Sequence, residues 1–184
     1  MRSFIAIELP GEVKSALSDL QREFKECGAD VRWVKPDNIH LTLKFLGDIH
    51  EDTIGAVQKI MEGACKGYSS FHLELHGAGT FPHMKSPRVV WTGLQDSEIL
   101  SKLQNEIERG LSTIGFKKEA RRFVPHLTLG RFRSMQKRAQ LLEKIGQYQE
   151  KQICSFAVNS VVLMKSELNP TGAQYTKMKE IFLK

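Results

Sequence analysis

The sequence predicts an α+β fold with two lobes, in which antiparallel sheets flanked by helices surround a central cleft. Strand-like segments alternate with amphipathic helical segments, and their order in the first half of the chain recurs in the second half. The peptide His-Leu-Thr-Leu also occurs once in each half, at residues 40–43 and 126–129. These repeats predict two lobes related by a pseudo-twofold axis. No linker or low-complexity tract divides the sequence, so we expect one domain over residues 1–184.

The first half is expected to begin with a strand at residues 3–8. A helix then follows, because apolar residues recur at helical spacing until Gly28. Its apolar stripe consists of Val13, Leu17, Leu20 and Phe24. A short strand at residues 31–34 precedes the first His-Leu-Thr-Leu strand. The next helix carries Ile54, Val57, Ile60, Met61 and Ala64 at helical spacing.

The second half repeats this order. Strands are expected near residues 71–75 and 88–92, before a helix that starts after Ser97 and ends at Gly115. The apolar face of this helix consists of Leu100, Leu103, Ile107, Leu111 and Ile114. A basic stretch at residues 117–122 leads to the second His-Leu-Thr-Leu strand. A helix at about residues 135–145 and strands near residues 155–164 and 174–182 complete the chain.

Composition describes an ordinary globular protein with a basic surface. Of 184 residues, 41% are hydrophobic and 26% charged, and 27 Lys and Arg exceed 21 Asp and Glu, which leaves a formal charge of +6. A basic surface favours an anionic partner such as RNA or a nucleotide. The three scattered cysteines argue against a disulfide framework and against a zinc site. We therefore expect a soluble protein of the reducing cytoplasm, not attached to a membrane.

Each His-Leu-Thr-Leu peptide presents an imidazole and a hydroxyl on one face of a strand, because alternate side chains share a face. The two leucines then point into apolar packing. A single histidine in a strand is usually structural, and threonine is a good strand former in any case. Packing alone gives no reason to place histidine twice in matching contexts, which favours a functional reading for His40 and His126. Thr42 and Thr128 are candidate donors to phosphate oxygens.

This set of groups suits the chemistry of a phosphodiester. Such a reaction needs one proton removed from the attacking oxygen and one delivered to the leaving oxygen, and imidazoles near neutral pH do both. Hydroxyl donors stabilise the charge that develops on the other oxygens. The residue two positions after each histidine is Thr instead of a second ligand, which makes a metal site the less favoured use, although it stays open as an alternative.

Phe45 and Arg131 each follow a motif histidine by five residues. An aromatic ring and a guanidinium plane both stack well on a nucleobase. Strict alternation would put both side chains on the face opposite the histidines, so the strand ends must twist for them to reach the cleft. Core packing for Phe45 and solvation or an ion pair for Arg131 are the alternatives.

The motifs and their flanks resemble the two-histidine phosphoesterase superfamily, and within it the RNA 2′,3′-cyclic phosphodiesterases, also called 2′-5′ RNA ligases. The resemblance covers essentially the whole chain. It rests on RSFIAI at residues 2–7, HLTLKFLG at 40–47, RVVW at 88–91, PHLTLGR at 125–131 and KSEL at 165–168.

The resemblance implies an enzyme without metal or other cofactor. It would open a 2′,3′-cyclic phosphate at the end of an RNA, such as a tRNA fragment, to a 2′-phosphomonoester, and some members also join such ends to a 5′-hydroxyl. By the same resemblance, His126 is the general base and His40 the general acid. Thr42 and Thr128 hold the phosphate, while Phe45 and Arg131 sandwich the terminal base. A monomer is expected, and the alternative function is an RNA- or nucleotide-binding module that uses the same cleft without turnover.

Overall fold

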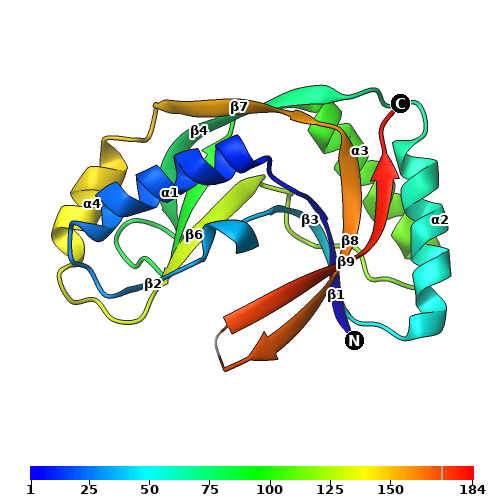
Figure 1. Cartoon of the computed structure of the whole chain (residues 1–184), viewed down its shortest axis with the longest axis horizontal. Coiled ribbons are helices and arrows are strands. Elements are labelled where there is room, and N and C mark those ends of the chain that lie inside the picture. The colour runs from blue at the N-terminus through cyan, green and yellow to red at the C-terminus, as the bar shows by residue number, and fades with distance from the viewer. Residues whose placement is uncertain (171) are drawn as a thin grey trace.

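The computed structural model contains two antiparallel β-sheets, each covered by two α-helices (Figure 1). The structure describes residues 1–170 and 172–184. The elements are β1 (Arg2–Ile7), α1 (Gly11–Lys25), β2 (Val31–Trp33), β3 (Leu41–Asp48), α2 (Ile54–Cys65), β4 (Phe71–Phe81), β5 (Val89–Leu94), α3 (Glu98–Thr113), β6 (His126–Phe132), α4 (Arg138–Gly146), β7 (Gln152–Val158), β8 (Ser160–Asn169) and β9 (Gly172–Phe182), with short 3-10 helices at Pro36–Asn38 and Glu51–Thr53. The predicted α+β class is confirmed.

The four-stranded sheet has the order β3-β1-β8-β9, and the five-stranded sheet has the order β2-β6-β5-β4-β7. The four strands of the first sheet have counterparts in the second sheet, where β2 is an additional edge strand. β1 lies between β3 and β8 in the first sheet, just as β5 lies between β6 and β4 in the second. The two His-Leu-Thr-Leu segments therefore hold equivalent places next to β1 and β5, and β3 and β6 meet near the middle of the molecule (Figure 1).

The two lobes do not coincide with the two halves of the chain. Helix α1 follows β1 but packs with α4 on the five-stranded sheet, on the left in Figure 1. Helix α3 follows β5 but packs with α2 on the four-stranded sheet, on the right. Each of these two helices thus leaves the sheet that contains the strand before it and packs on the other sheet.

One predicted strand was wrong. The segment expected as a single strand near residues 155–164 is divided at Asn159 into β7 and β8, which belong to different sheets. Buried apolar residues occur on both sides of the break, at Phe156, Val158, Val161 and Leu163. An apolar run of this kind shows burial but not the place where a chain leaves one sheet for another.

The main apolar core is one continuous cluster that includes residues from both sheets, and a smaller cluster contains Phe4, Ala6, Val162 and Met164. The four motif leucines, Leu41, Leu43, Leu127 and Leu129, belong to the main core and are at most 3% exposed. The burial that alternation predicted for these leucines is confirmed. None of the helices in the described part of the chain has the length and apolar character that crossing a membrane requires.

Candidate active site

The two motif strands line one large cavity. Its volume is about 1000 Å³, and its walls include residues of β1, β3, β6 and β9. All six residues that the sequence singled out lie along this cavity: His40, Thr42, Phe45, His126, Thr128 and Arg131. The structure therefore brings together side chains that are more than 80 positions apart in the sequence. We call this cavity the cleft.

Phe45 reaches the cleft because β3 contains a β-bulge. In the register of β1 and β3, Ala6 pairs with Thr42 and Phe4 pairs with Phe45, so the pairing skips Leu43. Paired residues share a face of the sheet, and Phe4 and Ala6 belong to one small apolar cluster. The extra residue therefore returns Phe45 to the face of Thr42, which strict alternation would not do.

Arg131 is turned into the cleft in the same way. In the register of β5 and β6, Trp91 pairs with Thr128 and Val89 pairs with Arg131, so the pairing skips Leu129. Each motif thus has a bulge at its last leucine. The predicted twist of the strand ends is in fact a bulge in each motif strand.

Two buried glutamines donate hydrogen bonds to the backbone at the bulges. Gln104 Nε2 of α3 donates to the carbonyl oxygen of Leu43 (3.3 Å), and Gln21 Nε2 of α1 donates to that of Leu129 (2.9 Å), which also accepts from the backbone N–H of Val34 (2.9 Å). A bulge interrupts the ladder of backbone hydrogen bonds, and a buried carbonyl without a partner is costly. The helices that cross to the opposite lobe therefore stabilise the local distortion that aims Phe45 and Arg131.

Sequence reasoning missed these glutamines, although a signal was present. Gln21 follows Leu17 by four residues, and Gln104 follows Leu100 by four residues. Both glutamines therefore lie on the apolar stripe of their helix, and both are buried. A polar residue at the same core position of two equivalent helices indicates a specific backbone partner.

The backbone determines which nitrogen of each imidazole is left without a backbone partner. His40 Nδ1 lies 2.9 Å from the carbonyl oxygen of Asn38, and His126 Nδ1 lies 2.8 Å from that of Val124. A carbonyl oxygen can only accept, so Nδ1 carries the hydrogen in both rings. In each histidine Nε2 is then the nitrogen that can take or give a proton.

Aromatic rings support both imidazoles. His40 stacks on Phe4 with 4.5 Å between ring centroids, and it forms a T-shaped pair with Tyr175 with centroids 5.0 Å apart. His126 forms a T-shaped pair with Phe81 with centroids 4.9 Å apart. These three supporting residues come from β1, β9 and β4, and sequence reasoning missed them because it cannot give the order of strands in a sheet.

Burial lowers the pKa of His40, because loss of solvent disfavours the charged ring. The hydrogen bond to the Asn38 carbonyl and the negative charge of Glu8 act in the opposite direction but are weaker. Burial likewise raises the pKa of Tyr175, and the nearby guanidinium groups of Arg131 and Arg2 partly counter this. The ring of His40, beside the four-stranded sheet, is thus largely shielded from water.

Positive charge surrounds the histidines. Arg2, Arg121, Arg122 and Arg131 all line the cleft. Such a concentration of guanidinium groups suits a phosphate-bearing ligand. Within the described residues there is no group of three or more His, Cys, Asp and Glu side chains placed to hold a metal ion.

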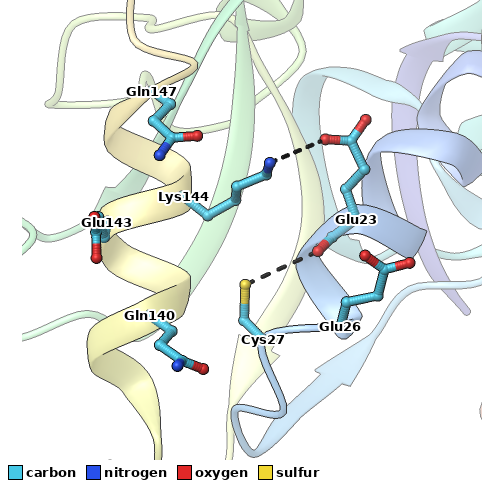
Figure 2. A pocket seen from close by; sticks show the side chains of 7 residues that line it. All are labelled: Glu23, Glu26, Cys27, Gln140, Glu143, Lys144 and Gln147. Carbon is cyan, nitrogen blue, oxygen red and sulfur yellow. Dashed lines mark hydrogen bonds and ion pairs between the residues drawn. The ribbon is translucent and has the colours of Figure 1, made fainter.

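A second, smaller hollow lies between α1 and α4 and contains none of the predicted residues (Figure 2). Glu23, Glu26 and Glu143 line it together with Lys144 and the Cys27 thiol. Lys144 Nζ is 3.5 Å from Glu23 Oε2, so part of the charge is paired within the hollow. Its acidic lining is unsuited to a phosphate, which leaves the cleft as the candidate site.

Two curated proteins similar to this chain carry the same name. An RNA 2′,3′-cyclic phosphodiesterase of Methanothermobacter thermautotrophicus is 37% identical over 182 residues, which cover 99% of this chain and 98% of the relative. Another protein of that name, from Thermotoga maritima, is 35% identical and covers 98% of this chain and 94% of its own length.

Solved structures agree with these relatives. The TT0787 protein of Thermus thermophilus superposes with a TM-score of 0.86 at 26% identity and covers 100% of this chain and 98% of its own. Escherichia coli LigT in complex with 3′-AMP superposes with a TM-score of 0.80 at 28% identity, over 99% and 97% of the two chains.

The sequence profile of the 2′-5′ RNA ligase superfamily matches residues 10–170. This match, together with the curated relatives, confirms the resemblance found in the two motifs and the prediction of an enzyme. With both motif strands lining one cleft, the chain belongs to the 2′-5′ RNA ligase superfamily.

Proposed function

We propose that this protein opens RNA terminal 2′,3′-cyclic phosphates to 2′-phosphomonoesters without a metal ion, using His40 and His126 as acid and base. The observation that carries the proposal is the matched pair of imidazoles in one cleft, each with Nδ1 on a backbone carbonyl and Nε2 available for proton transfer. The shared name of the curated relatives supports the same substrate class.

In the proposed reaction His126 Nε2 removes a proton from water, and the resulting oxygen attacks phosphorus. The bond between phosphorus and O3′ breaks, and His40 Nε2 delivers a proton to O3′. The assignment of the two roles follows the family resemblance. Because burial lowers the pKa of His40, its ring is best protonated once an anionic phosphate lies beside it.

The other cleft residues bind and orient the substrate in this proposal. The hydroxyls of Thr42 and Thr128 donate to the phosphate oxygens, where negative charge grows as the water oxygen attacks. Phe45 is 68% exposed, so its ring is available to stack on the terminal base, opposite Arg131. An RNA 5′-hydroxyl in place of water would give a 2′-5′ phosphodiester by the same proton transfers, which is the proposed ligase activity.

The test uses a short RNA that ends in a 2′,3′-cyclic phosphate, incubated with EDTA. We expect conversion to the 2′-phosphate, distinguished from the 3′-phosphate by chromatography. His40→Ala and His126→Ala should each reduce the rate by about 10²–10⁴. His50→Ala serves as the matched control, since His50 is exposed and lies outside the cleft.

Two alternatives make different predictions. A binding module without turnover would hold the RNA with a strong salt dependence but release no product. A metal site at the histidines would show stoichiometric metal in elemental analysis and lose activity with EDTA. Full activity in either histidine variant would remove that residue from the mechanism.

A further inference from the structure

We propose that the loop between α3 and β6, residues 114–125, forms a second phosphate-binding subsite in the cleft. Its ligand would be the phosphodiester on the 5′ side of the terminal nucleotide, held by Arg121 and Arg122. This inference rests on the proposed function and names the preferred substrate as an oligonucleotide instead of a single nucleotide.

A buried ion pair anchors this loop. Lys44 Nζ of β3 donates to Glu108 Oε1 of α3 at 2.6 Å, and their side chains are only 7% and 12% exposed. Lys44 Nζ also donates to the carbonyl oxygen of Lys117 (2.8 Å), and the backbone N–H of Glu119 donates to Glu108 Oε1 (2.7 Å). The pair therefore holds the loop backbone at two points just before the arginines.

Within the described residues, the four-stranded sheet has no counterpart of β2, the strand that pairs with β6 in the five-stranded sheet, and the Lys44–Glu108 pair holds a loop beside β3 instead. Gly130 holds the place in the second motif that Lys44 holds in the first. A Cβ at Gly130 would lie 2.6 Å from Val31 Cγ1 and 3.0 Å from the Trp33 ring, so glycine lets β2 lie directly against β6. No β-strand occupies residues 114–125, where Lys44 and Glu108 hold a loop instead. The cleft is therefore asymmetric, with a basic loop on one side.

The arginines of the loop are available to a ligand. Arg121 and Arg122 line the cleft and are exposed, and neither forms an ion pair with any residue in 1–170 or 172–184. Lys44 neutralises the charge of Glu108, so Glu119 is the carboxylate on this wall of the cleft that counters the two arginine charges. Two guanidinium groups on an anchored loop therefore give this wall a net positive charge.

The chemistry of the substrate determines which phosphate group would contact Arg121 and Arg122. A 2′,3′-cyclic phosphate occupies both O2′ and O3′, so the RNA continues only from the 5′ oxygen of the terminal nucleoside. The next phosphate in the cleft is consequently the 5′ phosphodiester. The cleft volume of about 1000 Å³ is at the upper end of the range of small-molecule sites, roughly 300–1000 Å³, which leaves room beyond the reacting nucleotide.

The test compares a nucleoside 2′,3′-cyclic phosphate with the dinucleotide that adds one 5′ phosphodiester. We expect wild-type protein to show a higher kcat/KM on the dinucleotide. In the double variant Arg121→Ala/Arg122→Ala the ratio of the two kcat/KM values should fall by roughly tenfold or more, the size expected for lost hydrogen bonds to a charged group.

A matched control removes the same charge from the same loop. The side chains of Lys117 and Lys118 are exposed and do not line the cleft, so Lys117→Ala/Lys118→Ala should keep the wild-type ratio. Lys44→Met/Glu108→Leu keeps both arginines but removes the anchor, and it should lower the ratio as the arginine variant does. If the arginine variant loses the same factor in kcat/KM on both substrates, the proposed subsite is wrong. It is also wrong if the lysine control lowers the ratio as much as the arginine variant does.

Binding distinguishes a wrong subsite from a wrong function. Calorimetry should give tighter binding of a dinucleotide 3′-phosphate than of a nucleoside 3′-phosphate, and the arginine variant should lose that difference. If wild-type protein hydrolyses neither cyclic phosphate but keeps this difference, the proposed function fails and the subsite stands. If both substrates react equally well and bind equally well, the subsite fails and the function stands.

Discussion

The residues packed around His40 alter its protonation. Stacking on Phe4 and the edge contact with Tyr175 exclude water from its ring, and burial lowers its pKa below the usual value of about 6.5. A general acid must be protonated to act. The acid role therefore predicts that kcat/KM falls as the pH rises through this lowered pKa, so its alkaline limb lies below about pH 6.5.

The dependence of kcat on pH should differ, because the anionic substrate beside the ring favours the charged imidazole. Its alkaline limb is expected at higher pH than that of kcat/KM, which steady-state rates measured across the pH range would show. In His40→Ala the alkaline limb should disappear. Loss of the acid limb instead would make His40 the base and reverse the proposed roles.

At this scale the sequence predicts which residues meet but not how they are oriented. The repeated motif places His40, Thr42, His126 and Thr128, and all of them line the cleft. The bulge that turns Phe45 into the cleft was beyond prediction, because it depends on the register between two strands and on the partner of a buried carbonyl.

The bulges in β3 and β6 determine the shape of the site. Because Gln104 donates to the carbonyl at the β3 bulge, we expect its substitution to affect substrate binding. Gln104→Leu leaves the Leu43 carbonyl buried without its side-chain partner, which should cost about 1–3 kcal/mol of unfolding free energy. Because the bulge aims Phe45, we expect KM for cyclic-phosphate RNA to rise several-fold while kcat changes less, as for a lost binding contact. Urea unfolding and steady-state kinetics measure the two effects.

Leu103→Ala is the matched control for this prediction. Leu103 neighbours Gln104 on α3 and is fully buried, and its truncation should cost about 2–5 kcal/mol by leaving a cavity. A leucine side chain cannot donate to the bulge carbonyl, so KM should stay near the wild-type value. A rise in KM in both variants would show that lost stability, not the bulge, changes binding.

The Lys44–Glu108 pair makes a prediction about stability. Removing one member leaves the other charged and buried, so Lys44→Met should destabilise the protein by about 3–5 kcal/mol. Lys44→Met/Glu108→Leu removes both charges and should recover most of that loss, since an apolar pair of similar size is often nearly neutral. Chemical denaturation of the two variants tests this, and equal losses in both would contradict it.

Helices were predictable as elements because their apolar stripes are long and periodic. The predicted stripe appears in α3 from Leu100 to Leu111, and the helix starts after Ser97 as expected, with Ser97 Oγ accepting from the Leu100 N–H at 3.2 Å. Ile114, expected on the same apolar face, follows the last residue of the helix and is 37% exposed. The strand near residues 155–164 failed, because one apolar run serves two sheets. Periodicity indicates which face of a helix or strand is buried, but it does not indicate which sheet a strand joins.

For the whole molecule, the crossed helices explain why the two lobes share a core. α1 starts from the four-stranded sheet and packs on the five-stranded one, and α3 does the reverse. Repetition in the sequence predicted two related lobes, but not this exchange, because the packing partner of an amphipathic helix is decided by tertiary contacts. The exchange also puts Gln21 and Gln104 beneath the motif of the opposite lobe.

We therefore expect both lobes to unfold together, as a single domain. The two tryptophans, Trp33 and Trp91, lie in the five-stranded sheet, so their fluorescence reports that lobe, whereas circular dichroism reports the helices of both. The two signals should show coincident urea transitions. Leu163→Ala, a buried change in the four-stranded sheet, should destabilise by about 2–5 kcal/mol and shift the tryptophan transition as much as the dichroism one. If the tryptophan transition stays at its wild-type midpoint in this variant, the lobes unfold independently and the shared core does not couple them.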